Sequence, residues 1–151
     1  TDLIYKIFFL MLENFMETNF KSRSFTIVFW LMLIVLAVDT LDTFNRLVVG
    51  YFTTGVVSIP GGPVVELTTI SLIISIPMIV AVLYGIYLLY KRKKVGGYWV
   101  LGANLLGNIV GFTVGPLSGH LSEGLPFFVI YFVIMIIVVI GIPRFYSEKF
   151  D

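Results

Sequence analysis

Residues 67–94 read LTTISLIISIPMIVAVLYGIYLLYKRKK, and this stretch decides the fold class. The run from Leu67 to Tyr90 carries no charge and is long enough for a helix to cross the hydrocarbon core of a bilayer. Four basic residues follow directly: Lys91, Arg92, Lys93 and Lys94. A second uncharged run then extends from Val95 to Gly119. The pattern predicts two membrane-spanning helices joined by a short basic loop.

The composition of the whole chain agrees with a membrane protein. Hydrophobic residues make up 58% and charged residues 13%, against roughly 25% charged in soluble domains. The formal net charge of +1, with no broad basic stripe, gives no basis for nucleic-acid binding. The sequence contains no cysteine, which excludes disulfides and thiolate metal sites within it. We expect no cofactor.

Four segments of the sequence are predicted to span the membrane: residues 25–41, 67–90, 98–117 and 126–142. We therefore expect an all-α integral membrane protein. Residues 21–151 would form a single domain, a bundle of four transmembrane helices.

Basic residues are placed on one side of this predicted bundle. Lys21 and Arg23 precede the first span, and the loop 91–94 separates the second and third. Arg144 and Lys149 follow the fourth span. The opposite loops carry four acids and one cation: Asp39, Asp42, Glu66, Glu123 and Arg46. Because cytoplasmic loops are enriched in Lys and Arg, we expect both termini to be cytoplasmic.

Residues 1–20 are predicted to form a separate amphipathic helix at the membrane interface. Asp2, Lys6, Glu13 and Glu17 fall on one narrow side of a helix, and apolar residues cover the rest. Acids outnumber the single lysine, whereas helices that bind anionic lipid usually present Lys and Arg. We therefore favour packing along the membrane surface or against another subunit over simple lipid anchoring.

The third predicted span carries the strongest packing signal. Small residues recur four apart, a spacing that lets another helix backbone approach closely. Two amides with the same spacing would be costly against lipid, so they should bond another helix or line a wet cavity. The predicted packing residues are Asn104, Gly107, Asn108, Gly111 and Gly115. Pro116 should kink the helix or end it near Thr113.

A weaker polar stripe runs along the second span. Thr68, Ser71 and Ser75 lie at helical spacing, and Pro77 then removes one backbone donor and frees the carbonyl of Ile73. Interrupted helices of this kind occur at transporter binding sites, although plain kinks are more common. We expect Ser75 to help satisfy the freed backbone.

Candidate ion or proton chemistry lies on the outward-facing side, at Asp39, Asp42, Glu66 and His120. The spacing of Asp42 and Arg46 suits an ion pair if the first helix continues past Thr43. Carboxylates and one imidazole would suit a metal ion, but no metal-binding spacing motif accompanies them. We therefore expect no metal. The alternative is that these are ordinary polar residues at helix ends.

Two functions from different classes fit these features. The first is a non-catalytic, accessory or structural subunit of a larger membrane complex, with the glycine face and the N-terminal helix as contact surfaces. The second is a small oligomeric transporter or channel for an ion, proton or solute, using the outward-facing carboxylates. The expected partners are the lipid bilayer and either other membrane subunits or further copies of the chain.

Overall fold

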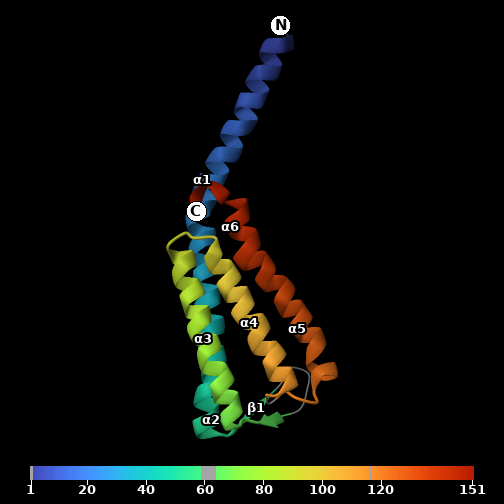
Figure 1. Cartoon of the computed structure of the whole chain (residues 1–151). Coiled ribbons are helices and arrows are strands. Elements are labelled where there is room, and N and C mark those ends of the chain that lie inside the picture. Colours follow the sequence, from blue (N-terminus) through green and yellow to red (C-terminus); the bar gives the residue numbers. More distant parts are fainter. Residues whose placement is uncertain (1, 59–63, 116) are drawn as a thin grey trace.

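The first helical segment is the longest element of the protein. The computed structural model describes the backbone of residues 2–58, 64–115 and 117–151, and side chains within these ranges from residue 20 onward. Helix α1 extends over Asp2–Phe44 and continues without a break through the π-helical turn η1, Asn45–Val49, into α2, Gly50–Thr53 (Figure 1). The part suited to crossing a membrane is Phe20–Thr53.

This continuity differs from the predicted separation at residue 20. No glycine or proline occurs between Phe20 and Thr43, so nothing in the chain breaks the helix there, and the charges at Lys21 and Arg23 do not end it. The predicted span 25–41 is correspondingly too short. The predicted amphipathic face of residues 1–20 lies outside the described side chains.

A short hairpin follows the first helical segment. Strands β1, Val56–Ser58, and β2, Val64–Glu66, pair antiparallel with Val57 opposite Val65. Gly55 precedes β1 with a φ of +70°, a conformation that glycine adopts without steric cost. The sequence indicated only a turn-rich connection here, so the all-α prediction misses this hairpin.

Three further segments complete the bundle, and each is long and apolar enough to cross a membrane. The elements are α3, Thr69–Tyr90; α4, Val95–Thr113; α5, Leu121–Ile136; η2, Ile137–Gly141; α6, Ile142–Phe145; and η3, Ser147–Lys149. Thr68 and Ser71 form a reciprocal capping box at the start of α3. Helix α3 continues through Pro77, and α4 ends at Thr113, as Pro116 indicated.

Apolar side chains cover the outside of these helices. Exposed examples occur on every candidate span, among them Ile34, Ile73, Val80, Leu106, Ile130 and Ile137. Such faces suit contact with hydrocarbon rather than water. The protein is therefore a multi-pass membrane protein with a lipid bilayer around it.

Helices α3 and α4 pack closely because glycines face each other across them. A Cβ at Gly96 would lie 2.5 Å from the carbonyl oxygen of Gly85, and one at Gly85 would lie 2.8 Å from that of Gly96. Gly97 lies in the same way against the backbone of Val139 in η2. These contacts bring three helical segments together beside the basic loop. The fully buried core side chains there include Leu36, Leu89, Val100 and Val139.

The basic loop between α3 and α4 is tied to the rest of the bundle. Arg92 adopts a φ of 60°, and its guanidinium lies over the rings of Phe25 and Phe29, 5.3 and 5.8 Å from their centroids. The backbone of Asp151 bonds to the loop in both directions, to Arg92 and Lys94, at 2.8 Å each. The loop therefore contributes tertiary contacts as well as charge.

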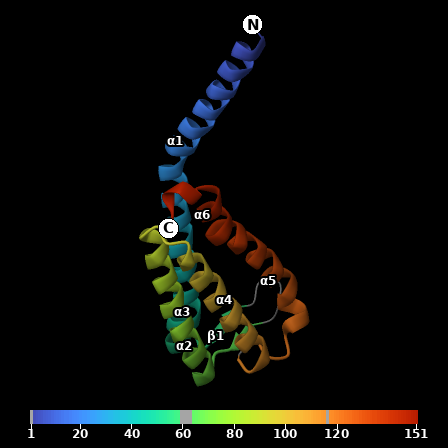
Figure 2. The same cartoon turned by 45° about the horizontal axis from the view of Figure 1, so that its top comes forward.

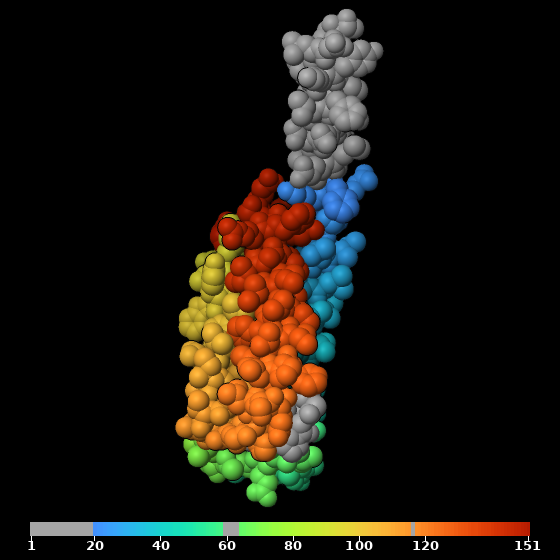
Figure 3. Space-filling view, turned by 90° about the vertical axis from the view of Figure 1, so that its right-hand side faces the viewer, coloured from blue at the N-terminus to red at the C-terminus, as the bar shows by residue number. Residues whose placement is uncertain are grey.

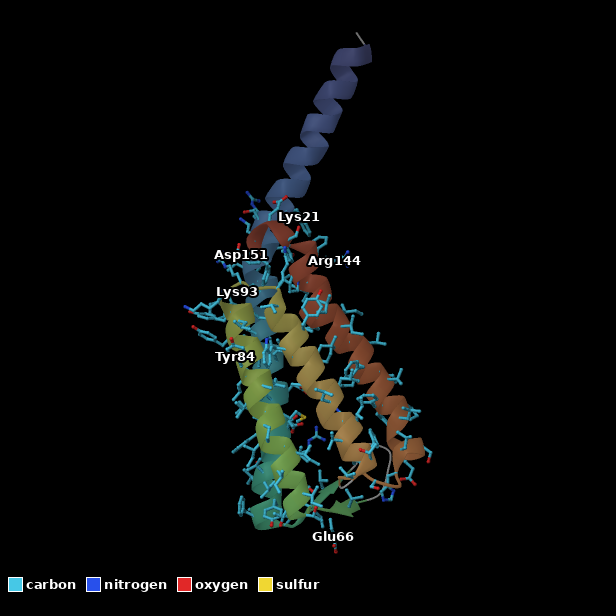
Figure 4. The ribbon with its side chains drawn as sticks, viewed as in Figure 1. Lys21, Glu66, Tyr84, Lys93, Arg144 and Asp151 are labelled. Carbon is cyan, nitrogen blue, oxygen red and sulfur yellow. The ribbon has the colours of Figure 1, made fainter. Side chains whose placement is uncertain are left out.

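The charged residues gather at opposite ends of the bundle. Figure 4 shows Lys21, Lys93, Arg144 and Asp151 at the end that carries the α3–α4 loop, with Glu66 at the hairpin end. The grouping of basic residues on one side, which was expected from the sequence, is therefore present. The grouping does not by itself show which end of the bundle faces the cytoplasm. The cytoplasmic location of both termini therefore stays a prediction.

Candidate functional site

A cavity of about 310 Å³ lies inside the bundle toward its hairpin end. It is bordered by α1, α3, α4 and α5, with Val57 and Ser58 of β1 among its lining. Most lining groups are apolar, but polar side chains from each of the four helices reach it. These are Asp39, Thr43, Arg46, Ser71, Ser75, Asn104, Asn108 and Tyr131.

The shape of the bundle explains where this space arises. Helix α5 leans away from α1 toward the hairpin end in both views of the ribbon (Figure 1, Figure 2). Beside the basic loop, Gly97 admits the backbone of Val139. Nearer the hairpin, Phe112 of α4 still contacts Phe128 of α5, with ring centroids 6.0 Å apart. Gly111 adds no side chain to the space between the helices, whereas Gly107 leaves room for Met78 of α3. Figure 3 shows α5 and η2 covering this face, with the hairpin below them.

Asp39 is the acidic residue of this cavity. Its carboxylate oxygen Oδ2 accepts a hydrogen bond from the Tyr131 hydroxyl at 2.7 Å. The same hydroxyl lies 3.4 Å from Oδ1 of Asn104. Asp39 is only partly buried, and it lies within the candidate span Phe20–Thr53 rather than in a loop. One phenol thus links the first, third and fourth spans.

The remaining polar groups are held by bonds to their own helices. The Ser75 hydroxyl donates to the carbonyl of Ser71 at 2.6 Å, and Oγ of Ser71 accepts from the backbone N–H of Thr68 at 3.0 Å. Asn104 and Asn108 each donate to the carbonyl four residues earlier, at 2.9 and 2.8 Å. Ser75 therefore bonds Ser71 rather than the carbonyl freed by Pro77. The two amides were expected to line a cavity or to bond another helix. Both line the cavity, and Asn104 also accepts a hydrogen bond from Tyr131 of α5.

Asp42 lies outside the cavity lining and pairs with Arg46 one turn later. This ion pair follows the spacing expected once the helix continues past Thr43. Arg46 also reaches the cavity, so one cation and one carboxylate border the same space. Arg46 is paired with Asp42, and among the described residues the Asp39 carboxylate has no ion-pair partner.

Glu66 and His120 are not brought to Asp39. Glu66 is exposed in β2, and His120 pairs with Glu123 at 2.9 Å in the connection to α5. Among the described residues, no three His, Asp or Glu side chains lie close enough to hold a metal ion. The four residues proposed as an ion or proton site therefore occupy three separate places, and Asp39 alone lines the cavity.

The glycines of the predicted packing face on α4 do not share one neighbour within the described chain. Gly107 abuts Met78 of α3, whereas a Cβ at Gly111 would meet only Leu117, at an ordinary 3.7 Å. Gly115 lies beyond the end of α4 and folds back against the backbone of Gly111. The four-residue spacing therefore picked out two glycines that line the cavity, Gly107 and Gly111. The close helix approach occurs instead at Gly85, Gly96 and Gly97.

Tyr131 is the site residue that the sequence analysis missed. The fourth predicted span is otherwise apolar, and no polar contact was predicted for it. The available signal was a lone phenolic hydroxyl in the run Leu125–Gly141, which holds no other hydrogen-bonding side chain. Such a hydroxyl needs a partner inside a bilayer.

The chain matches no family model, no curated protein and no solved structure. A bundle of four helices supports many activities, so architecture alone does not identify one. The chemistry of the cavity is the remaining guide to function.

Proposed function

We propose that this protein is a small membrane transport protein, a channel or transporter, whose cavity takes a small cation. The observation that carries the proposal is the Asp39 carboxylate in a cavity lined by residues of all four candidate spans. An ionisable side chain inside a span is costly and therefore marks ion or proton pathways more often than packing. Sodium, potassium and the proton are the candidate cations.

The hydrogen bonds around Asp39 favour a cation over an anion. The hydroxyl protons of Ser75 and Tyr131 are already donated within the protein. The second oxygen of Asp39, the amide oxygen of Asn108 and the oxygen of Ser75 stay available as acceptors. Carboxylate, amide and hydroxyl oxygens are the ligands that hard cations take.

Cation flux into liposomes tests the proposal, with Asp39→Asn beside the unaltered protein. Removing the charge should lower flux at least tenfold, since two unit charges about 4 Å apart attract by about 4 kcal/mol at an effective dielectric of 20. Glu66→Gln is the control, because it removes an exposed carboxylate at the same end of the bundle from a residue outside the cavity lining. Flux should be nearly unchanged in that variant.

Two results would overturn the proposal. One is an absence of cation flux from correctly inserted protein, with sodium, potassium and protons each tested. The other is equal flux from Asp39→Asn and the parent. If both variants lower flux equally, the overall negative charge of the hairpin end causes the loss. The cavity is then not the pathway.

The accessory-subunit function stays a prediction. The exposed apolar faces suit lipid and protein equally well, so they do not favour it over transport. Native mass measurement after gentle solubilisation separates the two. Recovery of a stable lone monomer would contradict the subunit function, whereas co-purification of unrelated membrane chains would support it.

A further inference from the structure

Exposed aromatic side chains form a belt on the outside of the bundle beside the basic loop. The belt consists of Trp30, Tyr84, Tyr87, Tyr90, Tyr98 and Trp99, each between 46% and 63% exposed. Between α1 and α3, the ring centroids of Trp30 and Tyr90 lie 6.4 Å apart. Between α3 and α4, those of Tyr84 and Trp99 lie 5.1 Å apart. Trp and Tyr favour the membrane–water interface, where the ring meets apolar groups while the N–H or O–H stays hydrated.

Lys91 joins this belt to the basic loop. Its ammonium lies 5.7 Å from the ring centroid of Tyr87 and 5.8 Å from that of Tyr90. The uncharged run that begins at Leu67 ends at Tyr90, directly before Lys91. Lysine side chains at span ends place their charge at the interface. The level of Tyr90 therefore suits the boundary between hydrocarbon and headgroups, and Figure 4 shows Tyr84 near the loop that carries Lys93.

A second aromatic group lies at the hairpin end. Tyr51 and Phe52 of α2 pack edge to face with their ring centroids 5.1 Å apart, and Phe52 is 74% exposed. The Tyr51 hydroxyl lies 3.2 Å from Oγ1 of Thr69, the first residue of α3. Tyr51 is therefore level with the start of α3, while the exposed Glu66 precedes that helix.

The distance between the two aromatic groups matches the thickness of a bilayer. Tyr51 follows Trp30 by 21 positions in one continuous helical segment, and Tyr90 follows Thr69 by 21 positions in α3. At a rise of about 1.5 Å per residue, each path is about 30 Å long. The hydrocarbon core of a bilayer is also about 30 Å thick. Two neighbouring antiparallel helices thus give the same thickness.

We propose that the aromatic belt and the Tyr51–Phe52 pair hold the bundle at the two headgroup interfaces of a bilayer, with the hydrocarbon core between them. This position places Asp39 near the middle of the hydrocarbon core, because it lies 9 positions after Trp30 and 12 before Tyr51. The position in the bilayer does not depend on whether the protein transports a cation.

The same depth applies to the ion pair of the first span. Asp42 and Arg46 also lie between Trp30 and Tyr51, at the level of the hydrocarbon core. Charged groups at such depth are tolerated where they face protein groups or water. Asp39 and Arg46 both line the cavity, which keeps their charges away from acyl chains.

Tryptophan fluorescence tests the proposed depth, because Trp30 and Trp99 are the two tryptophans of the sequence. The full chain is reconstituted into phosphatidylcholine vesicles that carry bromine, a quencher, either near the headgroup end of the acyl chains or near their methyl end. In Trp99→Phe, which leaves Trp30, we expect the larger loss of fluorescence with the shallow bromine. An equal or larger loss with the deep bromine would overturn the proposal.

Two introduced tryptophans locate the middle of the core and the second interface in a variant that lacks Trp30 and Trp99. Leu41→Trp, at a 66% exposed position near the level of Asp39, should lose more fluorescence to the deep bromine. Phe52→Trp is the matched change on the same continuous segment, and it should lose more to the shallow bromine.

Other results for this pair overturn the proposal. If neither bromine quenches Phe52→Trp, the hairpin end lies in water. If Leu41→Trp is quenched mainly by the shallow bromine, Asp39 is not near the middle of the bilayer. Should Leu41→Trp fail to fold, Val38→Trp, at a 60% exposed position directly before Asp39, makes the same measurement.

Discussion

Tyr131 shows how one hydroxyl organises the cavity. Its donor is within hydrogen-bond distance of Asp39 on α1 and of Asn104 on α4. A charged acceptor strengthens such a bond, and loss of the donor leaves the carboxylate without its partner in a partly dry space. The phenol therefore positions Asp39 for a ligand and also holds α5 against the other helices where they diverge.

We expect Tyr131→Phe to destabilise the protein by about 1–3 kcal/mol, because a hydrogen bond to a charged acceptor is lost while the ring is kept. The effect should depend on Asp39. In a double-mutant cycle with Asp39→Asn, thermal unfolding in detergent should reveal a coupling of about 1 kcal/mol or more.

Tyr146→Phe is the matched control for that cycle. It removes another interhelical tyrosine bond, the one to Ser24 at the opposite end of the bundle. Because Tyr146 and Asp39 share no partner, their effects should add. Additive effects for Tyr131 and Asp39 as well would contradict a direct bond between them.

At the scale of helices, glycine placement decides which pairs pack and where space is left. Gly85 and Gly96 lie on either side of the α3–α4 loop, so the antiparallel helices bring them face to face. Gly111 lies farther from the loop and lines the cavity, and a Cβ there would meet only Leu117, at 3.7 Å. Glycines therefore allow the helices to pack closely at the basic end of the bundle, and a glycine lines the cavity toward the hairpin end.

Gly96→Ala should lower the free energy of unfolding by about 1–3 kcal/mol, the usual cost of overpacking. The added methyl would meet the backbone of α3, which cannot move aside as a flexible side chain would. Gly102→Ala on the same helix should be neutral or stabilise by up to about 1 kcal/mol, since nothing lies within 4 Å of its added Cβ and alanine favours helix. Equal destabilisation of both variants, measured by unfolding in detergent, would contradict the observed packing.

The whole molecule has two chemically different ends. The basic loop, the start of the first span and the segment after α6 meet at one end, where the backbone of Asp151 bonds the loop. The hairpin, with the exposed Glu66, lies at the other. A polarised bundle of this kind should insert with its basic end in the cytoplasm.

Single cysteines test this orientation, because the sequence contains none of its own. Lys93→Cys should be labelled by a membrane-impermeant maleimide only after the cells are opened. Glu66→Cys, which is equally exposed at the opposite end, should be labelled from outside. The reverse pattern would overturn cytoplasmic termini.

Composition and charge placement determined the class of this protein and the positions of its spans. Apolar runs of sufficient length must become helices in lipid, because the bilayer offers no partner for unpaired backbone groups. Runs of this kind predicted all four spans, and the charges predicted which ends lie together. The extent of the first helix was misjudged, since the charged residues Lys21 and Arg23 do not break a helix as proline or glycine would.

Only the tertiary structure decided which residues meet. Sequence spacing places Asn104 and Asn108 on one face of a helix, but it does not reveal that Tyr131 lies opposite them or that His120 does not. Those pairings depend on how α1, α4 and α5 lie relative to one another, which contacts between residues far apart in the sequence decide. The site depends on a long-range contact, and a local pattern carries no information about such contacts.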